Sequence, residues 1–313
     1  MKKIILILLI LCCVSSFSQA AFNYYGRNKP ITIWSGMGMN LFACADNGST
    51  LSEYFDDWVD VLLANGFTEI RVGIPDYATG AVAVTKAAIA IAVGKGAKVI
   101  WGVGASYTGL TAANYEAYRT AVKAAADWAE DNGVFEFQIG NEEEAHNDDD
   151  TLTDTQLITN LKSLATEVQA IFTNGNVSYT TMYGNIAAWI SGGKGDLDFL
   201  AWNCYKGGGG VFSDTTYKNV ITNLINAFGV DGTYLTELGL SYTNLDDYDE
   251  DEEVQAADLT VMIDYIKDSG IKRASYFCFY DDSRQFGPAG FGALKTDKET
   301  YRLLWNSLIN SDK

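Results

Sequence analysis

The chain has 313 residues, and 48% of them are hydrophobic, which is enough to bury a large core and excludes global disorder. Forty acidic residues against 22 basic ones leave a formal net charge of -18, so nucleic acid and anionic membrane surfaces are unfavourable partners. The only histidine, His146, excludes metal sites built from several histidines and leaves any His-dependent catalytic triad to one residue.

The first twenty residues have the pattern of a secretory signal peptide. Lys2 and Lys3 form a positively charged start, residues 4–14 are apolar, and Ser18-Gln19-Ala20 is a small-residue cleavage signal. The apolar run is too short for a comfortable membrane span, and no later stretch is long and apolar enough for one. We therefore expect cleavage after Ala20. The mature protein is then expected to be secreted, extracellular or periplasmic, and not to be associated with the membrane.

The expected mature chain, residues 21–313, has no internal repeat and no interdomain linker, so we expect one domain. It keeps three cysteines, Cys44, Cys204 and Cys278, which allow one disulfide at most and leave open whether any two of them pair.

Short β-rich runs alternate with longer helical segments along this domain. The predicted strands are residues 36–40, 69–74, 98–103, 135–140, 178–184, 199–205, 234–240 and 274–280. The predicted helices are residues 51–65, 114–132, 153–174, 216–228, 253–269 and 298–309. Most of the strand runs are almost continuously apolar, which is typical of a parallel sheet covered on both faces.

Eight strands, each followed by a helix or a long crossover, predict an α/β fold, a single (β/α)₈ TIM barrel. A doubly wound open sheet shows the same alternation and is the competing architecture. However, no G-x-G-x-x-G opens a helix after the first strand, and no G-x-x-x-x-G-K-[ST] occurs anywhere. The glycine run at 207–210 lacks that spacing and is interpreted as a loop.

Candidate catalytic residues lie where the predicted strands end, which is where TIM barrels carry their chemistry. Strand four ends in Asn141-Glu142, and strand seven contains Glu237. Arg71 lies in strand two, and Tyr205 ends strand six. Two carboxylates at one barrel mouth suit glycosidic bond cleavage, because one protonates the leaving oxygen while the other attacks the anomeric carbon.

These motifs resemble those of the clan A glycoside hydrolases, which are retaining (β/α)₈ enzymes, and most nearly those of the family 5 type. The resemblance implies that Glu142 is the acid/base and Glu237 the nucleophile. It further implies that Asn141 bonds the sugar 2-hydroxyl, that Arg71 supports the nucleophile, and that the Tyr205 hydroxyl hydrogen-bonds it. No metal or other cofactor is expected.

The sequence departs from the family 5 pattern at two strand ends. Strand six has Asn203-Cys204-Tyr205 where the family usually has His-x-Tyr. Strand eight contains Phe277 and ends in Tyr280, where the family usually has a Trp.

Other candidates near the predicted cleft have weaker signals. Glu143 and Glu144 are alternatives to Glu142 as the acid, but a solvated helix start or loop is the favoured interpretation of both. His146 either contacts a sugar subsite or is a solvated loop residue. Trp189 and Tyr280 are the better candidates for stacking on a sugar ring, because the apolar faces of pyranoses pack on aromatic rings.

The sequence thus predicts a secreted, monomeric, retaining endo-β-glycanase that acts on a polysaccharide or oligosaccharide, with a β-glucan favoured. A β-mannanase or another clan A endo-glycosidase is an alternative, and a non-catalytic glycan-binding barrel is another. A Schiff-base lyase or aldolase would depend on Lys206, just past strand six, and ranks low. The acidic runs at 148–150 and 246–253 lack calcium-loop spacing and are interpreted as solvated loops.

Overall fold

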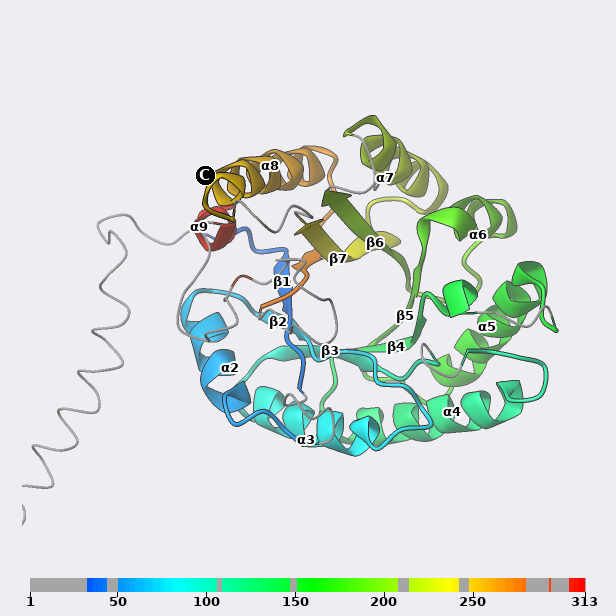
Figure 1. Ribbon diagram of the computed structural model, residues 1–313. Helices are drawn as coiled ribbons and strands as arrows, with labels where there is room; N and C mark the ends of the chain where they lie inside the picture. Colours follow the sequence, from blue (N-terminus) through cyan, green and yellow to red (C-terminus); the bar gives the residue numbers. More distant parts are fainter. Residues whose placement is uncertain are drawn as a thin grey trace, which may run out of the picture.

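The computed structural model describes residues 33–43, 50–105, 109–146, 151–207, 214–241, 248–279, 293 and 304–312. Eight parallel strands follow chain order around a closed barrel, which Figure 1 views along its axis. The barrel closes because β1 pairs with both β2 and β8. This closure confirms the predicted TIM barrel and excludes the open sheet.

Each predicted strand is found in its expected place, with ends that differ by a few residues. The strands are β1 (Met37–Asn40), β2 (Glu69–Arg71), β3 (Lys98–Gly102), β4 (Glu136–Asn141), β5 (Asn176–Thr181), β6 (Phe199–Gly207), β7 (Thr233–Ser241) and β8 (Ala274–Tyr276). The early end of β5 arises because the chain turns at once into the 3₁₀ turn η2 (Tyr183–Asn185).

Helices surround the barrel, and two of them, α3 and α6, were not predicted. The helices are α2 (Phe55–Ala64), α3 (Ala81–Gly94), α4 (Tyr115–Asp131), α5 (Asp154–Gln169), α6 (Ile186–Gly192), α7 (Asp214–Phe228), α8 (Tyr248–Asp268) and α9 (Leu304–Ile309). Helix α3 is built almost entirely from Ala, Val and Ile and has no polar stripe that would mark its helical period. None of the helices described is long and apolar enough to cross a membrane.

Local signals explain several helix ends. Thr153 begins α5 with a capping box, in which Thr153 and Gln156 bond each other's backbone N–H. Gly133 follows α4 with a φ of 72°, a conformation that glycine adopts without steric cost. Helix α2 begins at Phe55 rather than at 51, with no side-chain hydrogen bond at its cap.

The strands alternate between apolar side chains that face the helices and polar ones that face the barrel interior. In β2, Ile70 belongs to the hydrophobic core while its buried neighbours Glu69 and Arg71 are charged. In β4, Phe137 and Ile139 likewise alternate with polar residues. The expectation of almost continuously apolar strands was therefore wrong. The main core is the layer between strands and helices, while the barrel interior is a network of polar side chains joined by hydrogen bonds and ion pairs.

Candidate active site

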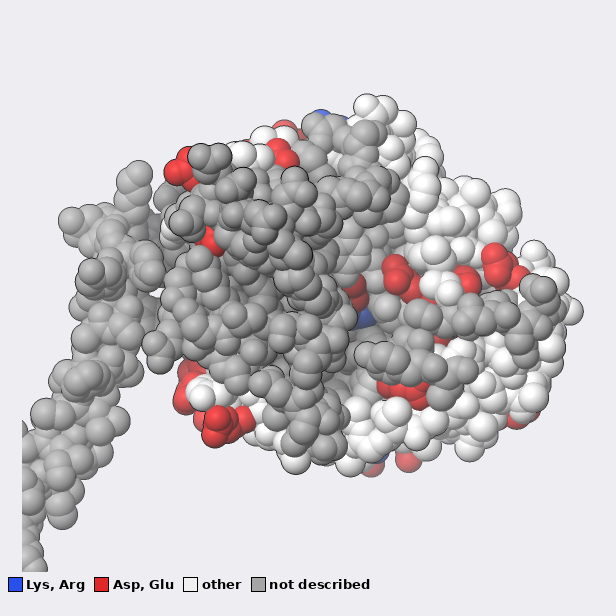
Figure 2. Space-filling model, in the orientation of Figure 1, with Lys and Arg blue, Asp and Glu red and all other residues white. Residues whose placement is uncertain are grey.

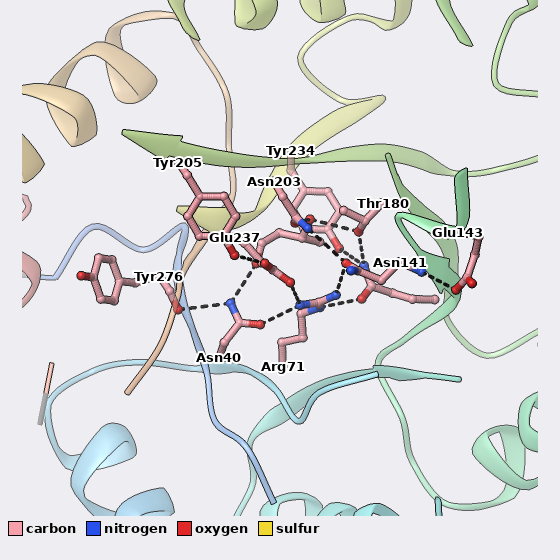
Figure 3. Close-up of polar contacts among 12 residues, drawn as sticks. Asn40, Arg71, Asn141, Glu143, Thr180, Asn203, Tyr205, Tyr234, Glu237 and Tyr276 are labelled. Carbon is pink, nitrogen blue, oxygen red and sulfur yellow. Dashed lines mark hydrogen bonds and ion pairs between the residues drawn. The ribbon is translucent and has the colours of Figure 1, made fainter. Parts of the chain in front are cut away.

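Arg71 lies at the centre of a polar cluster inside the carboxyl end of the barrel (Figure 3). Its Nη1 donates to Glu237 Oε1 at 2.6 Å and to Asn40 Oδ1 at 2.9 Å. Its Nε donates to Gln138 Oε1 at 2.7 Å, and its Nη2 donates to Asn141 Oδ1 at 2.8 Å. Only 2% of Arg71 is exposed, and a cation so buried requires such partners.

Glu237 receives a second hydrogen bond on its other oxygen. The Tyr205 hydroxyl donates to Glu237 Oε2, while the Arg71 guanidinium holds Oε1. The two oxygens are thus fixed by donors from β2 and β6. A carboxylate held in one orientation by two donors is suited to act as a nucleophile.

An irregularity in β7 aims Glu237 into the barrel. Trp202 pairs with Leu235 and Asn203 pairs with Glu237, so Thr236 is an extra residue on the β7 side. Thr236 also faces the interior, where its hydroxyl donates to Asn203 Oδ1 at 2.9 Å. In a regular strand two successive side chains point to opposite faces, so the bulge is what turns both inward.

Strand β4 has the same kind of irregularity just before Glu142. Gln138 pairs with Ser178 and Asn141 with Thr180, which leaves one extra residue on β4. Glu142 follows with a φ of 56°, and no other non-glycine residue among those described has a positive φ. Such a backbone conformation is sparsely populated and persists only where its surroundings hold it, as often occurs at functional sites.

The electrostatic environment of Glu142 favours its protonated form. Burial raises the pKa of Glu142 to about 7, and the negative charge of Glu237 adds to this effect. Hydrogen bonding by the Asn203 side chain and the charge of Arg71 act in the opposite direction. A carboxyl with a pKa near neutrality suits a group that must first donate and then accept a proton.

Four of the residues predicted from the sequence, Arg71, Asn141, Tyr205 and Glu237, are brought together by the structure. The side chains that hold them were not predicted: Asn40, Gln138, Thr180, Asn203 and Thr236. Asn203 stood out in the sequence only as a departure from the family pattern. It donates to Asn141 Oδ1 at 3.3 Å. The sequence signal that could have identified these supporting residues was a polar residue at alternate positions of otherwise apolar strands.

Glu143 and Glu144 were expected to be solvated, and this was wrong. Glu143 is fully buried, and burial raises its pKa to about 8, against the opposing effect of backbone N–H donors from Asn141 and Ala105. Glu144 is also buried, which raises its pKa, and it accepts hydrogen bonds from Trp189, Tyr179 and Thr181. Neither carboxylate faces solvent at the barrel mouth.

Trp189 was expected to border the cleft, and the structure corrects this too. It is fully buried in α6, its Nε1 donates to Glu144 Oε1 at 2.7 Å, and its ring packs against Tyr179. Burial leaves no ring face open for a sugar. His146 ends the 3₁₀ turn η1 (Glu143–His146), but its side chain lies outside the described part of the structure. Tyr280 lies outside the described residues altogether.

Lys206 lies within β6 rather than beyond it, paired with Leu240. Within the described ranges, no group of three or more His, Cys, Asp or Glu side chains could hold a metal ion. Cys204 and Cys278 are buried free thiols, whereas Cys44 lies outside the described residues. In Figure 2, acidic and basic side chains are visible together in a hollow near the centre of the face shown.

Comparison with solved structures finds the same fold in carbohydrate-active enzymes. An endo-β-1,4-xylanase of glycoside hydrolase family 10 from Gloeophyllum trabeum is 14% identical, with a TM-score of 0.65 over 90% of this chain and 99% of that one. A family 5 xyloglucanase from Paenibacillus pabuli is 15% identical, with a TM-score of 0.62 over 89% and 97%. An exo-β-1,4-mannosidase from Opitutaceae bacterium strain TAV5 is 12% identical, with a TM-score of 0.62 over 88% of this chain.

The structural neighbours are clan A glycoside hydrolases. At these identities the likeness shows the fold alone. The match to the mannosidase spans 59% of that protein's length, which is less than two thirds of it. No protein-family model and no curated protein sequence matches this chain.

An aromatic side chain of the chain segment after β8, Phe277, lies beside the candidate site. Its ring meets the Tyr205 ring edge-on, with centroids 5.5 Å apart and an interplanar angle of 89°. A second edge-on contact joins Phe277 to Phe42. Phe277 therefore packs against the tyrosine that holds Glu237.

Proposed function

We propose that this protein is a retaining endo-β-glycanase that cleaves a β-linked polysaccharide with two glutamates and no cofactor. The observation that carries the proposal is the pairing of two carboxylates with different surroundings. Glu237 is held through both of its oxygens by Arg71 and Tyr205. Glu142, with a pKa raised to about 7 by burial and by Glu237, retains a proton near neutral pH.

In the first step of the proposed reaction, Glu237 attacks the anomeric carbon and forms a covalent glycosyl ester. The bond from that carbon to the glycosidic oxygen breaks, and Glu142 gives its proton to the departing oxygen. The ester removes the negative charge of Glu237. Because that charge raises the pKa of Glu142, its loss makes Glu142 a stronger acid and readies its conjugate base for the second step.

In the second step, Glu142 takes a proton from water, and the water oxygen attacks the same carbon. The ester bond breaks, the sugar leaves with its original anomeric configuration, and both carboxyl groups return to their starting states. Asn141 is suited to bind the 2-hydroxyl. Its Oδ1 accepts hydrogen bonds from Arg71 and Asn203, so its Nδ2 is the atom that can donate to a sugar.

A β-glucan is the substrate we favour, with β-mannan and other plant or algal polysaccharides as alternatives. Solved structures with this fold are named as a xylanase, a xyloglucanase and a mannosidase, so their names do not favour one sugar. The signal-like pattern of residues 1–20 supports action outside the cytoplasm, where polymeric substrates are found.

The test is hydrolysis of a panel of soluble β-glucan, mannan, xylan and xyloglucan, with product lengths and anomeric configuration followed over time. We expect one polymer to be cut internally with retention. Glu237→Ala should reduce that activity by about a thousandfold or more, because the covalent step has no other nucleophile. Azide should restore part of it and yield a glycosyl azide of inverted configuration.

The same panel distinguishes the alternative functions. A non-catalytic glycan-binding barrel would migrate more slowly in affinity electrophoresis through a gel that contains the polymer, and it would not shorten that polymer. Glu237→Ala would then bind the polymer as well as the wild type does. Release of single sugars from one chain end would indicate exo action. Inversion by the wild-type protein would contradict the retaining mechanism.

A further inference from the structure

The two acidic residues after Glu142, Glu143 and Glu144, hydrogen-bond to different groups. Glu143 connects the ends of two strands. Glu143 Oε1 accepts from the backbone N–H of Asn141 at 3.0 Å, a contact visible at the edge of Figure 3. Its Oε2 accepts from the backbone N–H of Ala105 at 2.9 Å. Asn141 ends β4 and Ala105 follows β3, so a single buried carboxyl group fastens these two strand ends together.

Only a carboxyl group can make this connection. Both of its oxygens meet an N–H donor, and a glutamine of the same shape would turn its own NH₂ toward one of them. An amide nitrogen cannot accept a hydrogen bond, so one buried backbone N–H would lose its partner. Glu143→Gln therefore preserves the size of the side chain and removes half of the connection.

The backbone around Glu143 leaves room for this carboxyl group. A Cβ added to Gly104 would lie 2.7 Å from Glu143 Oε1, and one added to Gly140 would lie 2.8 Å from the same atom. Both distances are shorter than a normal contact. Any side chain larger than hydrogen at either position would push the carboxyl group away.

The connection made by Glu143 helps to fix the backbone of Glu142, whose φ is 56°. Glu142 N donates to Thr180 O at 2.8 Å, and Glu143 N donates to the Tyr179 hydroxyl at 2.9 Å. Asn141, immediately before Glu142, is held through its own N–H by Glu143. A sparsely populated conformation persists when the residues on both sides are fixed in this way.

We propose that Glu143 is a positioning residue for Glu142, its carboxyl group holding the backbone that presents the acid/base to the glycosidic oxygen. This inference rests on the proposed function. It differs from a purely structural role in one measurable respect. A misplaced acid/base impairs proton donation, so its loss is felt most by substrates whose leaving group needs a proton.

The experiment compares two substrates: the polysaccharide that the wild type hydrolyses, and the dinitrophenyl β-glycoside of its sugar, whose leaving group departs without a proton. The quantity compared is kcat/KM, because it reports the first step, in which the leaving group departs. Glu142→Ala provides the reference, with a severe loss of kcat/KM on the polymer and a much smaller one on the aryl glycoside. For Glu143→Gln we expect kcat/KM to fall by about 10- to 100-fold on the polymer and by less than about fivefold on the aryl glycoside.

Glu136→Gln is the matched control, because Glu136 is also a fully buried glutamate of β4 but bonds Ser178, Tyr234 and Arg273 instead of the backbone beside Glu142. This variant should lower the unfolding temperature and change kcat/KM on both substrates by the same factor. If Glu143→Gln does not fold, Gly104→Ala applies the test, since its methyl group displaces the same carboxyl group. Selective loss on the polymer is expected there too.

Equal losses on the two substrates for Glu143→Gln or Gly104→Ala, or no loss at all, would overturn the positioning role while leaving the proposed function intact. A wild type that hydrolyses neither substrate would overturn both.

Discussion

At the scale of single residues, the site separates two chemically identical carboxyl groups by their neighbours. Glu237 accepts one hydrogen bond from a guanidinium and one from a phenol. Glu142 is half-buried, and both its burial and the charge of Glu237 favour its neutral form. Asn203 opposes that effect, because its hydrogen bond to the charged form lowers the pKa of Glu142.

This environment predicts the pH dependence of hydrolysis. In the proposed mechanism the free protein is active only while Glu142 is protonated, so kcat/KM on a polysaccharide should fall as pH rises through about 7. Asn203→Ala removes a contact that stabilises the ionised form, so the pKa of Glu142 should rise and the falling limb should move to higher pH. A pH–rate profile of both proteins measures this.

The matched control for the pH profile is Glu142→Ala assayed on the aryl glycoside. That variant should lose the falling limb, because it has no acid to deprotonate. A limb that persists unchanged in Glu142→Ala would assign the titration to another group. A shift to lower pH in Asn203→Ala would show that the Asn203 side chain does not stabilise the ionised form of Glu142.

At the scale of elements, the sequence predicted where strands occur but not how they are distorted. The positions of Asn141 at the end of β4 and of Glu237 within β7 follow from apolar runs broken by polar residues. The bulges in β4 and β7 do not, because they depend on hydrogen bonding to neighbouring strands that local sequence does not encode. For the same reason the burial of Glu143 and Trp189 was missed, since each is decided by contacts with distant segments.

The network around Arg71 makes a prediction at this scale. Gln138 accepts from Arg71 Nε at 2.7 Å and donates to Thr180 and Tyr234. Gln138→Leu should leave that charged donor unsatisfied, which costs about 1–3 kcal/mol of the free energy of unfolding. It should also free Arg71 to rotate and lower kcat by about tenfold. Denaturant unfolding and steady-state kinetics measure the two effects.

Ser178→Ala is the control for Gln138→Leu. Ser178 also faces the barrel interior, but it bonds Glu136, two residues before Gln138 on β4 and farther from the barrel mouth. Its loss should lower stability by about 1 kcal/mol and leave kcat unchanged. If Ser178→Ala reduced kcat as much as Gln138→Leu, the effect would belong to barrel stability in general rather than to Arg71.

At the scale of the whole molecule, alternation of strands and helices was sufficient to predict a barrel, because few architectures accommodate eight such units. The polar interior was not predicted. Arg273 bonds Glu69 and Glu136 in the half of the barrel opposite the site, so charges extend along much of the interior. Each charged side chain there needs a partner from another strand, and a single sequence does not reveal that pairing.

The proposed export of the molecule depends on residues 1–20, and processing tests it. When the full chain is produced in a bacterium, the mature protein should begin at Ala21 and accumulate outside the cytoplasm, as measured by intact mass and N-terminal sequencing. Ala20→Arg should block cleavage, because the position before the cut takes only a small residue. Gln19→Arg, one position earlier, is the control and should be processed normally. The apolar run contains Cys13, and a lipoprotein signal would leave a lipid on such a cysteine. A retained Met1, or a lipid on Cys13, in the wild-type protein would contradict the proposal.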